Sequence, residues 1–229
     1  MIAEKLHEVE ERIAAAKARR AKTLTDDVTL VAVTKNHDVA AMREAIDAGA
    51  TQVGENRVQE AQGKYETLDR TVTWHLIGHL QTNKAKQAVK FFDLIHSVDS
   101  EHLARAIDKE AAKLGKVQDI LVQVNVAKEA QKSGVMEEDL RSLMNLCDEL
   151  SNVRVLGLMF IAPDYEDRER CRPLFRHMHE IFLAAKDIPW KTSNIKCLSM
   201  GMSHDYEIAI EEGANIVRVG TAIFGPRQY

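Results

Sequence analysis

A lysine that follows the first apolar run is the residue of this sequence with the clearest chemical potential. Val31, Val33 and Lys35 alternate along the chain, so in a β-strand they share one face. A lysine on the same face as two buried valines loses hydration, which favours a neutral amine able to attack a carbonyl carbon. The alternatives are that Lys35 extends its amine to the rim of the fold or pairs with Glu55.

Glycine and hydroxyl residues follow the last two apolar runs of the chain. Gly201 and Ser203 come after the seventh run, and Gly220 and Thr221 come after the eighth. Backbone N–H groups and hydroxyls at such positions bind phosphate dianions. Each glycine taken alone could be a turn or helix-cap residue. Together, at these two positions, they favour a phosphate site.

Three more polar residues lie within or just past the apolar runs. Arg218 lies between two valines and needs an acceptor, which is either a carboxylate of the fold or a ring nitrogen of a ligand. Asn56 and His79 follow the second and third runs and could contact the same ligand, although a structural hydrogen bond is the alternative for the histidine. His75 and His79 lie at a strand end with no third ligand apparent, so we predict no metal site.

The elements that position these residues are short apolar runs separated by helical patterns. Several runs are apolar almost throughout, as expected for parallel strands covered on both faces. Helical periodicity follows Asp38 and Ser100, which we expect to cap their helices. The predicted strands are Val28–Thr34, Gln52–Gly54, Thr73–Ile77, Asp93–Ser97, Ile120–Val126, Val153–Phe160, Ile195–Leu198 and Asn215–Val219.

Eight strand–helix units in about 200 residues favour a closed (β/α)8 TIM-type barrel over an open sheet. The segments 45–56 and 209–220 resemble each other, as if one helix–strand unit were used twice. An open doubly wound sheet is the alternative, but no glycine-rich dinucleotide motif follows the first strand. We therefore expect one domain over residues 1–229, with an extra N-terminal helix at 1–25 and the barrel at 28–225.

Composition excludes several classes of protein. The net charge is −4 and 29% of the 229 residues are charged, so there is no basic excess for a nucleic-acid partner. We expect no signal peptide and no membrane span. The three cysteines are odd in number and widely spaced, which predicts core residues in a reducing cytoplasm and neither a disulfide framework nor a metal site.

A set of motifs, in order and with their spacing, resembles the pyridoxal phosphate homeostasis protein family. The resemblance runs from about Leu30 to Gly225 and includes no departure within the motifs. These motifs are VAVTK (31–35), GENRVQE (54–60), WHLIGHLQTNK (74–84), SVDS (97–100), SMGMSHD (199–205) and VRVGTAIFG (217–225). The resemblance implies a barrel similar to the N-terminal domain of alanine racemase (fold type III) with pyridoxal 5′-phosphate (PLP) as its cofactor.

The resemblance also implies roles for individual residues. Lys35, which closes VAVTK, matches the residue that forms the Schiff base with C4′ of PLP. Arg218 matches the residue that faces the pyridine nitrogen. Ser203, Gly220 and Thr221 match the residues that bind the phosphate group, and Ser199 lies close by and could contribute through its backbone. Asn56 and His79 match polar residues near the cofactor.

A protein that holds PLP fits these residues better than a catalyst does. Arginine does not donate its proton to the ring nitrogen, so the pyridine would be a weak electron sink. Racemisation needs an acid/base group on the second face of the cofactor, which in the racemases comes from a further C-terminal domain that we expect this chain to lack after Tyr229. The resemblance implies a protein that buffers PLP or delivers it to apo-enzymes. We expect a monomer, because the domain expected to be absent carries the usual racemase dimer surface, and the cysteines favour the cytoplasm.

Two other functions remain open on the sequence. A PLP-dependent racemase or lyase would need a second base, for which His79 is the candidate. A barrel enzyme that acts on a sugar phosphate would instead use Lys35 to form a Schiff base with its substrate.

Overall fold

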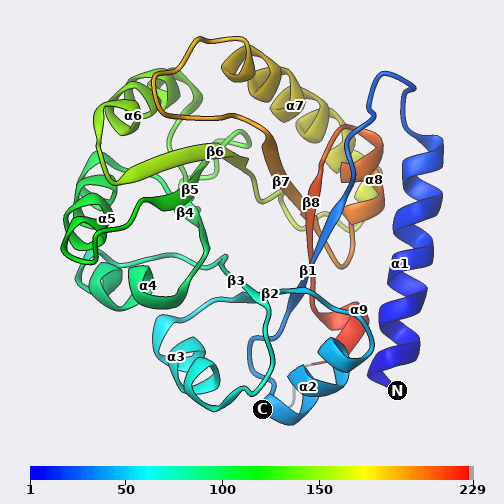
Figure 1. Cartoon of the computed structure of the whole chain (residues 1–229). Coiled ribbons are helices and arrows are strands. Elements are labelled where there is room, and N and C mark those ends of the chain that lie inside the picture. Colours follow the sequence, from blue (N-terminus) through cyan, green and yellow to red (C-terminus); the bar gives the residue numbers. More distant parts are fainter. Residues whose placement is uncertain (227–229) are drawn as a thin grey trace.

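The computed structural model describes residues 1–226, and these residues form a closed barrel of parallel strands in the order β1 to β8. Figure 1 shows the strands at the centre with helices around them. The strands are β1 Thr29–Val33, β2 Gln52–Glu55, β3 Thr73–Leu76, β4 Leu94–Val98, β5 Gln118–Gln123, β6 Val153–Met159, β7 Cys197–Met202 and β8 Ile216–Val219. The expected (β/α)8 barrel is confirmed.

Helices follow the strands and cover the outside of the barrel. Asp38 and Ser100 cap α2 and α5 through their side chains, as their sequence positions predict. The helices are α1 Ile2–Arg19, α2 Val39–Asp47, α3 Val58–Thr67, α4 Ala85–Phe91, α5 Glu101–Lys113, α6 Glu137–Glu149, α7 Arg172–Lys186, α8 Tyr206–Glu211 and α9 Thr221–Phe224, with 3-10 turns η1 Thr82–Lys84 and η2 Arg168–Cys171.

Every predicted strand overlaps the observed one, but each differs from it by at least one residue at an end, and the larger differences lie in the N-terminal helix, β5 and β7. The N-terminal helix ends at Arg19 and not near residue 25. β5 begins two residues earlier than expected. β7 was expected at Ile195–Leu198 but extends to Met202, so Gly201 lies within the strand and not after it. Gly201 has a left-handed φ of +96°, which a glycine accommodates. The expected domain also includes 227–229, which lie outside the described residues.

The core has two parts because the strands carry side chains on both faces. The larger part packs the outward strand faces against the helices. Inside the barrel, an apolar cluster is formed by Val31, Leu94, Leu121, Met159 and Ile216. The barrel interior also holds buried polar side chains on β3, β4, β7 and β8. Bulky apolar residues dominate most barrel interiors, and a buried polar group costs free energy unless it forms a hydrogen bond.

The extra helix α1 packs against α8, α9 and α2 (Figure 1). Its apolar stripe of Leu6, Val9, Ile13 and Ala16 is buried. It therefore covers the side of the barrel where the first and last strands pair and close the sheet.

Candidate functional site

A cavity of about 440 Å³ opens at the C-terminal end of the barrel strands. This is the end at which barrel enzymes and binding proteins place their ligands. Arg218 lines it from β8, and Lys35 lines it from the turn after β1. Ser203 lines it from the turn after β7, and Gly220 and Thr221 line it from the start of the segment after β8. Five of the eight residues that the sequence singled out therefore meet in one cavity.

Lys35 lies half-buried in a tight turn after β1 whose backbone is held at several points. Asn36 has a left-handed φ of 62°, and its N–H donates to Glu60 at 2.6 Å. The N–H of His37 donates to the carbonyl of Thr34 at 3.1 Å, which closes the turn. The base of the Lys35 side chain is therefore held in one position at the wall of the cavity.

Glu55 is fully buried under this turn and is bonded to Lys64 of α3. The Lys64 amine donates to Glu55 at 2.8 Å and to the carbonyl of Thr34 at 2.8 Å, and the hydroxyl of Thr34 also donates to Glu55. Burial raises the pKa of Glu55, while Lys64 counteracts the shift. Sequence reasoning overlooked Lys64, although the Glu60–Lys64 spacing of four residues along a helix was a visible signal.

Arg218 is 3% exposed and lines the cavity. Its nitrogens donate to the hydroxyl of Ser199 at 2.6 Å and to the carbonyl of Phe160 at 3.0 Å. Burial lowers its pKa to about 10. Among the described residues Arg218 forms no ion pair, so the alternative of a salt bridge within the fold is not found there. A buried guanidinium with N–H groups to spare is suited to a ligand acceptor.

The turns after β7 and β8 bring hydrogen-bond donors to one point. The N–H groups of Gly220 and Ala222 both donate to the hydroxyl oxygen of Ser203, at 3.2 and 3.4 Å. A Cβ atom at Gly220 would lie 3.2 Å from the carbonyl of Val33, so the close approach of β8 to β1 favours glycine here. The Ser203 hydroxyl accepts these two N–H groups and keeps its own proton to donate, and Thr221 brings a second hydroxyl to the same edge of the cavity. Donors of this kind fit a phosphate.

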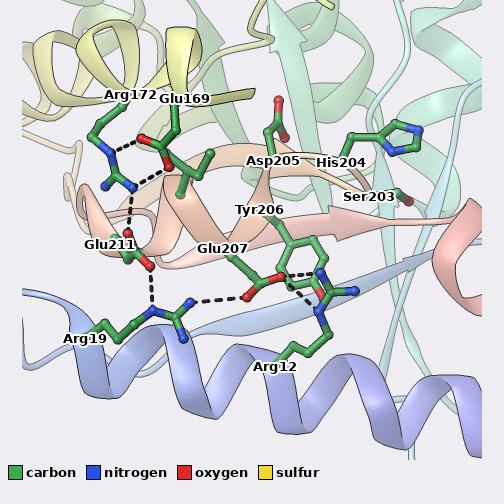
Figure 2. A pocket seen from close by; sticks show the side chains of 11 residues that line it. Arg12, Arg19, Glu169, Arg172, Ser203, His204, Asp205, Tyr206, Glu207 and Glu211 are labelled. Carbon is green, nitrogen blue, oxygen red and sulfur yellow. Dashed lines mark hydrogen bonds and ion pairs between the residues drawn. The ribbon is translucent and has the colours of Figure 1, made fainter. Parts of the chain in front are cut away.

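Ion pairs hold α8, which follows Ser203, between α1 and α7. Figure 2 shows Glu211 between Arg19 and Arg172, and Glu207 between Arg12 and Arg19. The Arg19–Glu211 and Arg172–Glu211 distances are 2.7 and 2.8 Å. These pairs line a second cavity of about 240 Å³. Each arginine there already contacts a carboxylate, so these ion pairs fix α8 between its neighbours.

The other three predicted residues do not line the main cavity in the described chain. Ser199 is fully buried beneath Arg218. His79 is exposed, with Nδ1 3.5 Å from the hydroxyl of Ser133. Asn56 lies at the end of β2, where its carbonyl is next to Gly78. Their contact with a cofactor stays a prediction. Two histidines that sequence reasoning did not select, His37 and His204, do line the cavity.

A chain of hydrogen bonds continues from Arg218 through the inside of the barrel. Ser199 is 3.0 Å from Nδ1 of His96, Nε2 of His96 is 2.8 Å from Nδ1 of His75, and Nε2 of His75 is 2.7 Å from Oε1 of Gln52. Burial lowers the pKa of His75 to about 4 and that of His96 well below its ordinary value. Both imidazoles are therefore neutral at pH 7.

The neutral state of His75 predicts that acid destabilises the fold. Below its ordinary pKa of about 6.5 the unfolded chain binds a proton at this residue, whereas the folded chain does so only near pH 4. The free energy of unfolding should therefore fall by about 3 kcal/mol from this residue as the pH drops from about 6.5 to about 4. Urea unfolding at pH 7 and pH 4.5 measures the loss.

His75→Gln should flatten this dependence of the free energy of unfolding on pH, and a slope as steep as that of the wild type would contradict the prediction. The same exchange at the exposed His102 is the control.

Within residues 1–226, no group of His, Cys, Asp and Glu side chains is arranged to hold a metal ion. In the same part of the chain, no helix combines the length and the apolar character that crossing a membrane requires. The three cysteines are free thiols.

Comparison with known proteins gives consistent matches over the whole chain. A family model described as alanine racemase, N-terminal domain, matches residues 9–228. The chain is 46% identical to a pyridoxal phosphate homeostasis protein of Aquifex aeolicus, over 99% of this chain and 98% of the relative. A protein of the same name from Pseudomonas aeruginosa is 39% identical over 100% of this chain and 96% of its own length.

Solved structures agree with these matches. PipY of Synechococcus elongatus, solved with PLP bound, superposes with a TM-score of 0.84 at 39% identity, covering 98% of this chain and 100% of that one. A histidine racemase of Leuconostoc mesenteroides superposes with a TM-score of 0.72 at 16% identity, over 99% of this chain and 57% of that one. The racemase shares the fold of this chain.

Proposed function

The chain belongs to the pyridoxal phosphate homeostasis protein family, and on this premise we propose that it binds PLP as a Schiff base on Lys35 and takes part in the homeostasis of that cofactor. The observation that carries the proposal is the content of a single cavity. An amine, a buried guanidinium without an ion pair in the described chain, and a set of phosphate donors all line it.

These groups match the reactive points of PLP. When bound, PLP supplies an electrophilic aldehyde carbon, a pyridine nitrogen and a phosphate. The Lys35 amine is the nucleophile for the aldehyde carbon. Arg218 offers N–H donors to the nitrogen, and Ser203, Gly220 and Thr221 offer donors to the phosphate. Ser199 would act through Arg218, which it bonds, and Asn56 and His79 would act from the rim.

We propose that the protein holds PLP with little or no catalysis. Arg218 keeps its proton at neutral pH because burial lowers its pKa only to about 10. It therefore donates a hydrogen bond to the ring nitrogen without protonating it, and that limits electron withdrawal into the ring. His37 and His204 also line the cavity, and an imidazole is the kind of group that could act as the second base of a racemase. This alternative is tested by incubation with PLP and L-alanine, which should yield no D-alanine at ordinary enzyme rates.

A holder of PLP has a further expected use, which is to buffer the free aldehyde and pass it to apo-enzymes. We propose that the chain does this as a cytoplasmic monomer, in keeping with its free cysteines. Transfer is measured by mixing the loaded protein with an apo-enzyme and following recovery of that enzyme's activity. Light scattering gives the mass in solution.

Titration of the purified protein with PLP tests the binding proposal. We expect an absorption band of the lysine-bound cofactor that saturates at one equivalent, and borohydride reduction should fix the label on the peptide that contains Lys35. Pyridoxal, which lacks the phosphate, should bind on the order of 100-fold more weakly because two or more charge-assisted hydrogen bonds are lost. Absence of the band, or equal affinity for pyridoxal, would refute the assigned site.

A further inference from the structure

We propose that His96 and His75 are positioning residues for Arg218, because they form with Ser199 and Gln52 a hydrogen-bond chain of one fixed direction behind its guanidinium. The inference rests on the proposed function in one respect: it takes the cofactor ring to be the ligand that Arg218 faces. The hydrogen-bond chain itself is present in the protein without ligand.

The members of the chain come from five strands of the barrel. Arg218 lies on β8, Ser199 on β7, His96 on β4, His75 on β3 and Gln52 on β2. The first four are at most 3% exposed. Gln52 is half-buried and lines a separate cavity at the opposite, N-terminal end of the strands. The chain therefore crosses the barrel from the ligand cavity to the other end.

The orientation of the Gln52 amide, whose carbonyl oxygen faces His75, sets the direction of the hydrogen-bond chain. A guanidinium has only donors, so the oxygen of Ser199 accepts from Arg218. At the other end, the carbonyl oxygen of Gln52 accepts, so Nε2 of His75 must carry its proton. A neutral imidazole then leaves Nδ1 as an acceptor.

The remaining two bonds follow from these ends. Nδ1 of His75 accepts from Nε2 of His96, which is 2.8 Å away. His96 then has a bare Nδ1, and this accepts the one proton of the Ser199 hydroxyl at 3.0 Å. All four contacts have one donor and one acceptor when both histidines are neutral and carry their proton on Nε2. A second proton on His75 would place two N–H groups opposite each other.

This hydrogen-bond chain holds an arginine that forms no ion pair with any carboxylate of residues 1–226. The arginine side chain has many rotamers, and within residues 1–226 its guanidinium donates to one hydroxyl and one carbonyl. Because the Ser199 hydroxyl must donate to His96, its lone pairs are directed at Arg218. An arginine already fixed in one orientation is not ordered again when a ligand binds, and this preorganisation increases affinity.

Two exchanges at one position separate positioning from bulk structure. Asparagine at 96 places its amide near the position of Nδ1, where it can still accept from Ser199. Glutamine places its amide nearer to Nε2 and leaves the Ser199 hydroxyl without its acceptor. We expect His96→Gln to weaken PLP binding about tenfold and to shift the absorption band of the bound cofactor, whereas His96→Asn should restore most of the affinity. Ser199→Ala should resemble His96→Gln.

Thermal unfolding of the PLP-free variants will show whether each variant is folded. Equal loss of affinity in His96→Gln and His96→Asn, with an unshifted band, would mean that the histidine acts by packing alone and would overturn the inference. Nitrogen-15 spectra of the wild-type imidazoles without PLP provide a test that does not depend on the cofactor. Both rings should be neutral with the proton on Nε2 at pH 7. A proton on Nδ1 of either ring would overturn the inference even if PLP binds, whereas failure of PLP to bind would leave this spectrum unchanged.

Discussion

Lys35→Ala is expected to abolish the absorption band of the bound cofactor and to weaken PLP binding on the order of 100-fold, because only the phosphate and ring contacts remain. The turn that carries Lys35 is held by backbone and by Lys64, Glu55 and Glu60. The substitution should therefore leave the fold intact. Absorption and equilibrium dialysis with PLP measure the two effects.

Lys132→Ala is the matched control for this prediction. Lys132 lines the same cavity, where its amine donates to the carbonyl of Ala162 at 3.1 Å and pairs with Glu129 at 2.6 Å. Its removal deletes a lysine from the cavity wall but should retain the band. A band that survives in Lys35→Ala and disappears in Lys132→Ala would show that Lys132, and not Lys35, forms the covalent link.

Gly157→Ala is expected to prevent stable folding, with a loss of more than about 4 kcal/mol. A Cβ atom on Gly157 would lie 1.8 Å from the carbonyl oxygen and 2.6 Å from the carbonyl carbon of Cys197. These are backbone atoms of the strand that pairs with Gly157, so relief of the clash requires separation of β6 from β7. The φ of +156° adds strain. Recovery of soluble protein and urea unfolding measure the effect.

Gly63→Ala is the control for Gly157→Ala. Gly63 lies exposed in α3 with no atom within 4 Å of an added Cβ. Alanine there should increase stability by about 0.5–1 kcal/mol through helix propensity and a less flexible unfolded chain. A Gly157→Ala variant as stable as Gly63→Ala would show that β6 and β7 are not paired as described.

The eight strands were recognisable in the sequence because a covered parallel strand is apolar on both faces. The predicted range of β7 was the least accurate of the eight. Ser199 and Gly201 interrupt its apolar pattern, and both belong to the strand because Ser199 is bonded inside the barrel while Gly201 leaves room for Ala209 and Tyr206. The end of the N-terminal helix was also misplaced, since residues after Arg19 are polar and equally suited to a loop.

The residues that line the cavity were predictable for a related reason. Lys35, Ser203, Gly220 and Thr221 follow strands in a barrel, and the carboxyl ends of parallel strands meet at one end. Arg218 was identifiable as a charge among valines. These are local signals, each contained in a few neighbouring residues.

The tertiary structure alone decided which buried polar groups contact one another. Ser199 and His96 are 103 residues apart in the chain, and Glu55 is bonded to Lys64 of the next helix and not to Lys35 as one interpretation had it. A strand pattern shows that a residue faces inward, but the partner across the barrel depends on closure of the sheet and on the stagger of its strands. The sequence thus determined the barrel and most of its ligand-facing residues, and the closed sheet determined the hydrogen bonds that hold Arg218.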